Sequence, residues 1–196
     1  MLKEYILSSR IQFIAEVKTC SPFGYQTSVP WIDLFQLANR IGDVISIHTD
    51  PRWGGSMEDI SRACALTRKP ILAKGIHKTD AEIIEALGHG AEYVLVVGRV
   101  PTFSPITVLE HCMIEPRSFA EISSIPRGHM LVWNSRDLYT GGLKKETVVD
   151  VRRVWDGWLC MASNIRTPED VTSVPVPINA VLIGTHLASF EHNRGF

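Results

Sequence analysis

Residues 93–97 read YVLVV and residues 180–184 read AVLIG, two short runs that lack polar residues at alternate positions. A strand buried on both faces has this pattern, and such strands occur in parallel sheets that are covered by helices. Six further short apolar segments recur along the chain. Together they predict strands at residues 11–18, 43–48, 70–74, 92–98, 106–112, 129–134, 157–162 and 179–184.

Helical patterns lie between these strands. Residues 31–41 carry apolar side chains at helical spacing, while Ser56 and Thr79 each precede an acidic residue by three positions, which is typical of a capped helix start. Alternating strands and helices predict right-handed parallel crossovers. We therefore expect an α/β protein in which residues 1–196 form a single (β/α)8 barrel domain, a TIM barrel. Its remaining helices are predicted at residues 115–124, 144–154 and 167–174.

The barrel is expected to be abbreviated in two places. Residues 99–105, which include two prolines, separate the fourth and fifth predicted strands, whereas a parallel connection normally needs about a dozen residues. Either this connection is an extended loop or the strand boundaries are displaced by a few positions. We expect the fourth crossover helix to be missing or very short. Because the first strand begins at residue 11, we also expect no N-terminal extension before the barrel.

Composition narrows the function classes. The chain has 196 residues, 45% of them hydrophobic and 21% charged, with a formal net charge of −1, which gives no electrostatic reason to expect nucleic acid or an anionic membrane as partner. The cysteines at positions 20, 64, 112 and 160 form no CxxC pair, so no zinc site is expected. The polar N-terminus and the lack of a long apolar stretch predict a cytoplasmic protein.

Polar residues at the ends of the predicted strands are the candidate functional groups. Glu16 and Lys18 are two residues apart and therefore share one face of a strand. In a closed parallel barrel that face is the interior, and the carboxyl ends of the strands meet at the mouth where barrel enzymes carry their active sites. The strand-end residues that we expect to meet there are Glu16, Lys18, Lys74, Glu110, Asn134 and Arg136.

Seven segments in order resemble the indole-3-glycerol-phosphate synthase family of tryptophan biosynthesis. They are FIAEVKTCSP, ISIHTD followed by GGS, KPILAKG, VLEHC, WNSRDL, MASNI and AVLIGTHLA. The resemblance runs nearly end to end and implies a lyase of the TIM-barrel fold. This activity converts 1-(2-carboxyphenylamino)-1-deoxyribulose 5-phosphate to indole-3-glycerol phosphate, carbon dioxide and water, without a cofactor. The implied partner is a small phosphorylated substrate.

The resemblance also implies roles for matching positions. Lys74 matches the general acid that protonates the substrate ketone, and Glu110 is matched to the base of the later dehydration. An ammonium suits the first task because it stabilises the negative charge that builds on the ketone oxygen and also donates a proton. Glu16 and Lys18 match a pair that contacts substrate and aids proton transfer.

Substrate-binding positions are implied in the same way. Asn134 and Arg136 match a pair that orients the substrate and its carboxylate, and Ser21 falls near the phosphate. The loops after the last two strands are the usual phosphate corner of this architecture. The phosphate-binding residues implied there are Ser163, Asn164, Gly184 and Thr185.

The sequence departs from the family pattern at several of these places. Gly75 and Ile76 follow Lys74 where the family has Asp-Phe, and the seventh-strand motif Glu-Ser-Gly-Ile is replaced by residues 162–165, ASNI. Ala162 thus replaces a carboxylate. Asn164 replaces a glycine, and asparagine tolerates the left-handed conformation that such a turn requires.

Other functions stay open at this point. One is a catalytically impaired barrel that acts as a phosphorylated-ligand-binding or scaffold protein, and another is a paralogue with a related phosphosugar substrate. A phosphoribosylanthranilate isomerase-like activity would use Cys20, but no partner aspartate is evident. A homo-oligomer or a partner that caps the mouth is also compatible with the sequence. The histidines at positions 48, 77, 89, 111 and 186 are expected to be packing or surface residues, and no metal site is expected.

Overall fold

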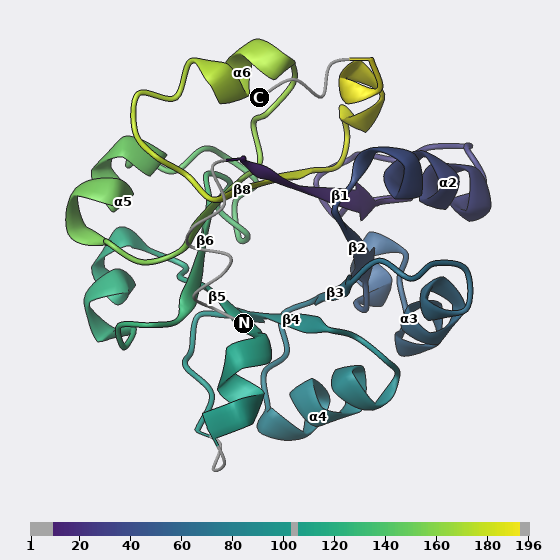
Figure 1. Ribbon diagram of the computed structural model, residues 1–196, viewed down its shortest axis with the longest axis horizontal. Helices are drawn as coiled ribbons and strands as arrows, with labels where there is room; N and C mark the ends of the chain where they lie inside the picture. The colour runs from purple at the N-terminus through teal and green to yellow at the C-terminus, as the bar shows by residue number, and fades with distance from the viewer. Residues whose placement is uncertain (1–9, 103–105, 193–196) are drawn as a thin grey trace.

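The computed structural model describes residues 10–102 and 106–192, which form one closed parallel barrel with strands in sequence order (Figure 1). Every neighbouring pair is parallel, including the pair of β1 with β8 that closes the ring. The predicted (β/α)8 TIM barrel is confirmed. The strands are β1 (Gln12–Val17), β2 (Val44–His48), β3 (Ile71–Lys74), β4 (Tyr93–Val97), β5 (Cys112–Glu115), β6 (Met130–Asn134), β7 (Leu159–Ala162) and β8 (Ala180–Ile183).

Helices surround the ring on its outside (Figure 1). The predicted starts at Ser56 and Thr79 are confirmed as capping boxes, in which each hydroxyl accepts from the backbone N–H three residues on. The α-helices are α2 (Trp31–Ile41), α3 (Met57–Cys64), α4 (Asp80–Gly88), α5 (Val148–Val154) and α6 (Pro168–Thr172), and the 3-10 helices are η1 (Pro51–Trp53), η2 (Ile106–His111), η3 (Phe119–Ser124) and η4 (Leu187–Phe190).

Two apolar layers hold the barrel together. One fills the interior with side chains such as Ile14, Leu72 and Val132, and the other packs the outward faces of the strands, including Ile45, against the helices. Because successive strand residues point to opposite faces, the residue two positions after each interior side chain also faces inward. This alternation brings the strand-end polar groups to one mouth.

The fifth strand was predicted in the wrong place. Residues 106–112 were expected to form it, but the 3-10 helix η2 occupies Ile106–His111 and β5 spans Cys112–Glu115. The connection from β4 therefore runs over residues 98–111, long enough for a parallel crossover. Of the two alternatives left open, displaced boundaries are correct. The crossover helix is very short, as expected.

Three further expectations concern the N-terminal extension, membrane-spanning helices and metal sites. The segment to which the missing extension refers, residues 1–9, is not described. Within residues 10–102 and 106–192, no helix is long and apolar enough to cross a membrane. No group of three or more His, Cys, Asp or Glu side chains in these ranges is arranged to hold a metal ion. All four cysteines are free thiols.

Candidate active site

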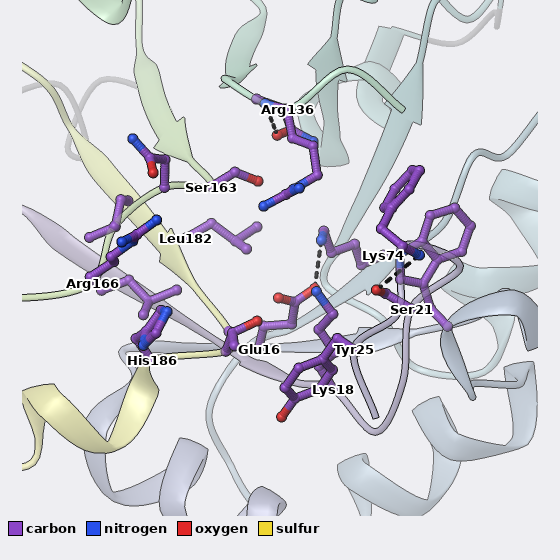
Figure 2. Close-up of a pocket in the computed structure, with 18 of the residues that line it drawn as sticks. Glu16, Lys18, Ser21, Tyr25, Lys74, Arg136, Ser163, Arg166, Leu182 and His186 are labelled. Carbon is purple, nitrogen blue, oxygen red and sulfur yellow. Dashed lines mark hydrogen bonds and ion pairs between the residues drawn. The ribbon is translucent and has the colours of Figure 1, made fainter. Parts of the chain in front are cut away.

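A cavity of about 230 Å³ opens at the carboxyl ends of the strands (Figure 2). Two smaller cavities, of about 40 Å³ and 90 Å³, adjoin it, and the side chains of Trp53 and Leu138 border all three. The predicted site residues that line the large cavity are Glu16, Lys18, Ser21, Lys74, Asn134, Arg136, Ser163, Asn164, Gly184 and Thr185.

Glu16 lies at the centre of a buried ionic cluster. It follows Ile14 by two residues on β1 and so faces inward, with only 6% of its surface exposed. Its Oε1 atom lies 2.6 Å from His48 Nε2 and accepts a hydrogen bond from Lys74 Nζ, also at 2.6 Å. Burial opposes ionisation of Glu16, but the attraction of Lys74 and His48 outweighs it and holds the pKa of Glu16 well below its ordinary value. Glu16 is therefore a permanent anion at neutral pH.

Gly184 makes room for this carboxylate. A Cβ atom at this position would lie 1.9 Å from Glu16 Oε2, far inside van der Waals contact. Any larger residue would push Glu16 away from Lys74. The glycine after β8 thus has a local structural reason to be there, in addition to the phosphate role that the sequence implied.

A second buried carboxylate stands at the end of β5. Glu115 is 2% exposed and accepts a hydrogen bond from Asn134 Nδ2 on β6 at 3.0 Å. It borders the 40 Å³ cavity together with Lys74 and His48. Burial raises the pKa of Glu115, and the opposing influences of Lys74 and the Asn134 hydrogen bond do not cancel that rise. Glu115 therefore holds a proton at a higher pH than an ordinary glutamate does.

Asn134 and Arg136 organise the loop that follows β6. The Asn134 Oδ1 atom accepts a hydrogen bond from the Arg136 backbone N–H at 3.0 Å, and Arg136 Nη1 donates to the Gly141 carbonyl at 2.6 Å. These bonds fix the loop while the Arg136 side chain borders the large cavity (Figure 2). A guanidinium held in this way is suited to binding a carboxylate or a phosphate.

Lys18 and Ser21 come from the loop after β1. The Lys18 ammonium lies 5.2 Å from the centre of the Tyr25 ring, a cation–π contact. Burial lowers the pKa of Lys18, although Glu16 opposes this. Ser21 borders the cavity and its Oγ accepts a hydrogen bond from the Phe23 backbone N–H at 3.3 Å.

The loops after β7 and β8 form the opposite side of the cavity. Ser163 and Asn164 adopt left-handed conformations, with φ of 65° and 56°, so the turn persists with asparagine in place of glycine. Figure 2 shows Arg166 and His186 across the cavity from Lys74. Both of these side chains border it. Arg166, Lys18, Lys74 and Arg136 bring more positive charge to the cavity wall than the carboxylate of Glu16 balances.

Glu110 does not reach this site. It lies on η2, which precedes β5, and its side chain is exposed. It borders none of the three cavities at the mouth. The expected convergence of Glu110 with Lys74 is therefore wrong, because the strand that was to carry Glu110 inward begins only at Cys112. The carboxylate that β5 carries to the mouth is Glu115.

Sequence reasoning also missed His48, which was expected to be a packing or surface residue. It is buried and bonded to Glu16, and its ring stacks on that of Trp53 with centroids 6.0 Å apart. A signal was present, because His48 ends ISIH as Lys74 ends ILAK. His77, by contrast, is a buried packing residue whose Nδ1 lies 2.6 Å from the Leu95 carbonyl.

The chain is similar in sequence to several known enzymes. No protein-family model matches the chain. An indole-3-glycerol phosphate synthase from Deinococcus radiodurans is 31% identical over 201 residues, which cover 92% of this chain and 74% of that protein. The enzyme of the same name from Beutenbergia cavernae is 29% identical, and the alignment covers 94% of this chain and 75% of that protein. The enzyme of that name from Leptospira interrogans is 24% identical, and the alignment covers 98% of this chain and 83% of that protein.

Proposed function

We propose that this chain, which belongs to the indole-3-glycerol phosphate synthase family, catalyses decarboxylating ring closure of 1-(2-carboxyphenylamino)-1-deoxyribulose 5-phosphate. One observation above all supports the proposal. The Lys74 ammonium lies where two adjoining cavities of the barrel mouth meet: Glu16 borders the large cationic cavity with it, and Glu115 borders the 40 Å³ cavity with it. These two buried carboxylates have opposite pKa shifts, lowered for Glu16 and raised for Glu115. The cavity suits a substrate that carries a carboxylate at one end and a phosphate at the other.

In the first step the aromatic carbon that bears the carboxylate attacks the ketone carbon, and a carbon–carbon bond forms. Lys74 donates a proton to the ketone oxygen as negative charge builds there. Glu16 holds the ammonium in place through the 2.6 Å bond. Loss of carbon dioxide then returns the electron pair of the broken bond to the ring and restores its aromaticity.

In the second step the new hydroxyl group leaves as water and the five-membered ring loses a proton. This dehydration needs an acid and a base close together. We assign the base to Glu115 rather than Glu110, because Glu115 borders the same small cavity as Lys74. A carboxylate whose pKa is raised by burial is a stronger base than an ordinary one.

The remaining residues bind the two ends of the substrate. Arg136 is assigned to the carboxylate, with Asn134 as the group that fixes both Arg136 and Glu115. Lys18 and Ser21 contact the sugar chain. The phosphate is assigned to the loops after β7 and β8, where the side chains and backbone of Ser163, Asn164, Gly184 and Thr185 border the cavity.

Incubation of the purified protein with 1-(2-carboxyphenylamino)-1-deoxyribulose 5-phosphate, called the ribulotide below, tests this function directly. We expect indole fluorescence to appear with the wild type and the rate to fall about 10³-fold in Lys74→Ala. Lys78→Ala is the matched control, because Lys78 is exposed and lies in the loop after the same strand. A folded wild type that forms no more product than Lys74→Ala would reject the activity.

A second candidate is a barrel that binds the phosphorylated ligand without turnover. The observation that favours it is Ala162, a buried methyl at the end of β7 where the family motif carries a carboxylate. Calorimetry separates the two. Tight binding of indole-3-glycerol phosphate with no turnover of the ribulotide would support this second function, and turnover above the Lys74→Ala level would exclude it.

A further inference from the structure

His48 offers a group that the proposed mechanism does not yet use. Its side chain is 5% exposed, and Nε2 lies 2.6 Å from the same Glu16 oxygen, Oε1, that accepts the Lys74 bond. One carboxylate oxygen thus binds two nitrogen atoms. A change in the bond between His48 and Glu16 therefore changes the electrostatic environment of the Lys74 ammonium.

The position of the ring is fixed by its surroundings. Trp53 stacks on His48 with an interplanar angle of 3°, and the backbone of Gly55 packs against the His48 carbonyl, which a Cβ atom at position 55 would approach to 2.0 Å. His48 also borders the 40 Å³ cavity with Lys74 and Glu115. The imidazole is therefore held against Glu16 and cannot turn away without displacing Trp53.

The charged groups around the ring determine its protonation. Burial lowers the pKa of His48, the anion Glu16 opposes that, and Lys74 and Lys18 add to the lowering. Asp50, in the loop after β2, also interacts with the ring. At neutral pH the imidazole is therefore uncharged, and Nε2–H donates to Glu16.

We propose that His48 is a positioning residue for proton transfer: its neutral ring holds Glu16 so that the carboxylate orients the Lys74 ammonium, and protonation of His48 weakens the hold of Glu16 on Lys74. This inference rests on the proposed function and assigns it a pH-dependent element. An imidazolium neutralises Glu16 and repels Lys74, so the acid at the reaction centre loses its fixed position as the pH falls.

Two variants separate the parts played by the hydrogen bond and by the charge. His48→Leu removes the donor, and we expect kcat to fall about tenfold with little change in KM. His48→Gln keeps an amide donor near the Nε2 position but cannot take up a proton. It should retain most of the activity at neutral pH, within about threefold of wild type.

The shape of the pH profile tests the charge. Burial raises the pKa of Glu115 and lowers the pKa of His48, so protonation of either group should reduce kcat as the pH falls, and the acid limb of log kcat should be steeper in the wild type than in a variant that lacks the imidazole. In His48→Gln the limb should be shallower. His111→Gln is the control, because His111 is bonded to the Glu92 carbonyl at the other end of β5. It should leave the wild-type slope unchanged.

An NMR titration of the protein without substrate makes the inference independent of turnover. The Lys74 ¹³Cε signal should shift at the pH where His48 titrates in the wild type, and this shift should be absent in His48→Gln. A Lys74 signal that does not respond to His48, or an acid limb with the same slope in wild type and His48→Gln, would overturn the proposal. Absence of turnover in the wild type would reject the proposed function alone, because the Lys74 titration would still decide whether His48 is coupled to Lys74.

Discussion

On the β1–β3 side of the barrel mouth, Glu16 lies between His48 and Lys74, whereas on the β5–β6 side Glu115 is bonded to the amide of Asn134. Both carboxyl groups are almost completely buried. Cationic partners lower the pKa of the first, and burial with a neutral partner raises the pKa of the second. The comparison shows how one residue type provides a fixed negative charge on one side of the barrel mouth and a carboxyl group that retains its proton to higher pH on the other.

The difference arises from the strands rather than from the glutamates. β3 ends in a lysine next to a histidine at the end of β2, and the two residues are paired in register. No strand next to β5 ends in a cation, since β4 ends in Val97 and β6 in Asn134. The order of the strands therefore gives Glu16 cationic neighbours and leaves Glu115 with a neutral hydrogen-bond partner, Asn134.

The largest effect on stability is expected when Glu16 is changed. Glu16→Gln removes the negative charge that compensates the buried Lys74 ammonium and leaves the His48 N–H with a weaker acceptor, and we expect the free energy of unfolding to fall by about 3 kcal/mol at pH 7. The folded-state pKa of Glu16 lies below the unfolded value, so its stabilisation is complete above pH 4.5, its ordinary value, and is lost as the pH falls through the folded value. Urea unfolding at several pH values measures this.

A deficit in Glu16→Gln that stays constant down to acidic pH would contradict the ionic interpretation, because the wild type should lose its advantage there. Glu85→Gln is a suitable control, since Glu85 is exposed on the surface of α4. It should change the unfolding free energy by less than about 0.5 kcal/mol.

Much of the Glu16 side of the site could be predicted from the sequence. Glu16 and Lys74 each lie at the end of an apolar run, and the period of two in a strand determines which face each of them shares with the interior side chains. What the sequence did not reveal is which of these groups touch. The bond between His48 and Glu16 depends on the pairing of β1 with β2, and a histidine at a strand end has the same local sequence pattern whether it packs in the core or binds a carboxylate.

The Glu115 side was predicted incorrectly for a different reason. Residues 106–112, ITVLEHC, are as apolar as a strand, whereas the real strand, CMIE, has only four residues. Four residues are too few for a periodicity to be recognised. The better signal was the connection length: a strand at residues 106–112 left too short a crossover, and moving it toward the C-terminus restored the room that a parallel connection needs.

The next largest effect concerns Glu115. Glu115→Gln should raise the free energy of unfolding by about 1 kcal/mol at pH 7, because the amide does not have to ionise in a buried place. The folded-state pKa is raised, so the wild type loses stability as the pH rises from the unfolded value through the folded one. Turnover should fall about 10²-fold. Thermal unfolding at pH 4 and pH 7, with a rate assay, measures both.

A Glu115→Gln variant that is less stable than wild type at pH 7 would show that the carboxylate contributes net stability, and the contrast with Glu16 would fail. A variant that is more stable but fully active would keep the contrast in stability and remove Glu115 from catalysis. The Asn134 hydrogen bond is preserved in either case, because the glutamine oxygen still accepts from Nδ2.

The smallest effect on stability and turnover is expected for a change at Glu110, because its carboxylate is exposed whereas those of Glu16 and Glu115 are buried. It lies on η2 and borders no cavity at the mouth, so Glu110→Gln should change the unfolding free energy by less than about 0.5 kcal/mol. Turnover should stay within about twofold of wild type, since a surface charge this far from the reacting atoms is screened by water. The same rate assay, run beside Glu115→Gln, decides which carboxylate is the base: a loss of activity in Glu110→Gln with none in Glu115→Gln would return the role to η2 and require a different arrangement of the fifth strand.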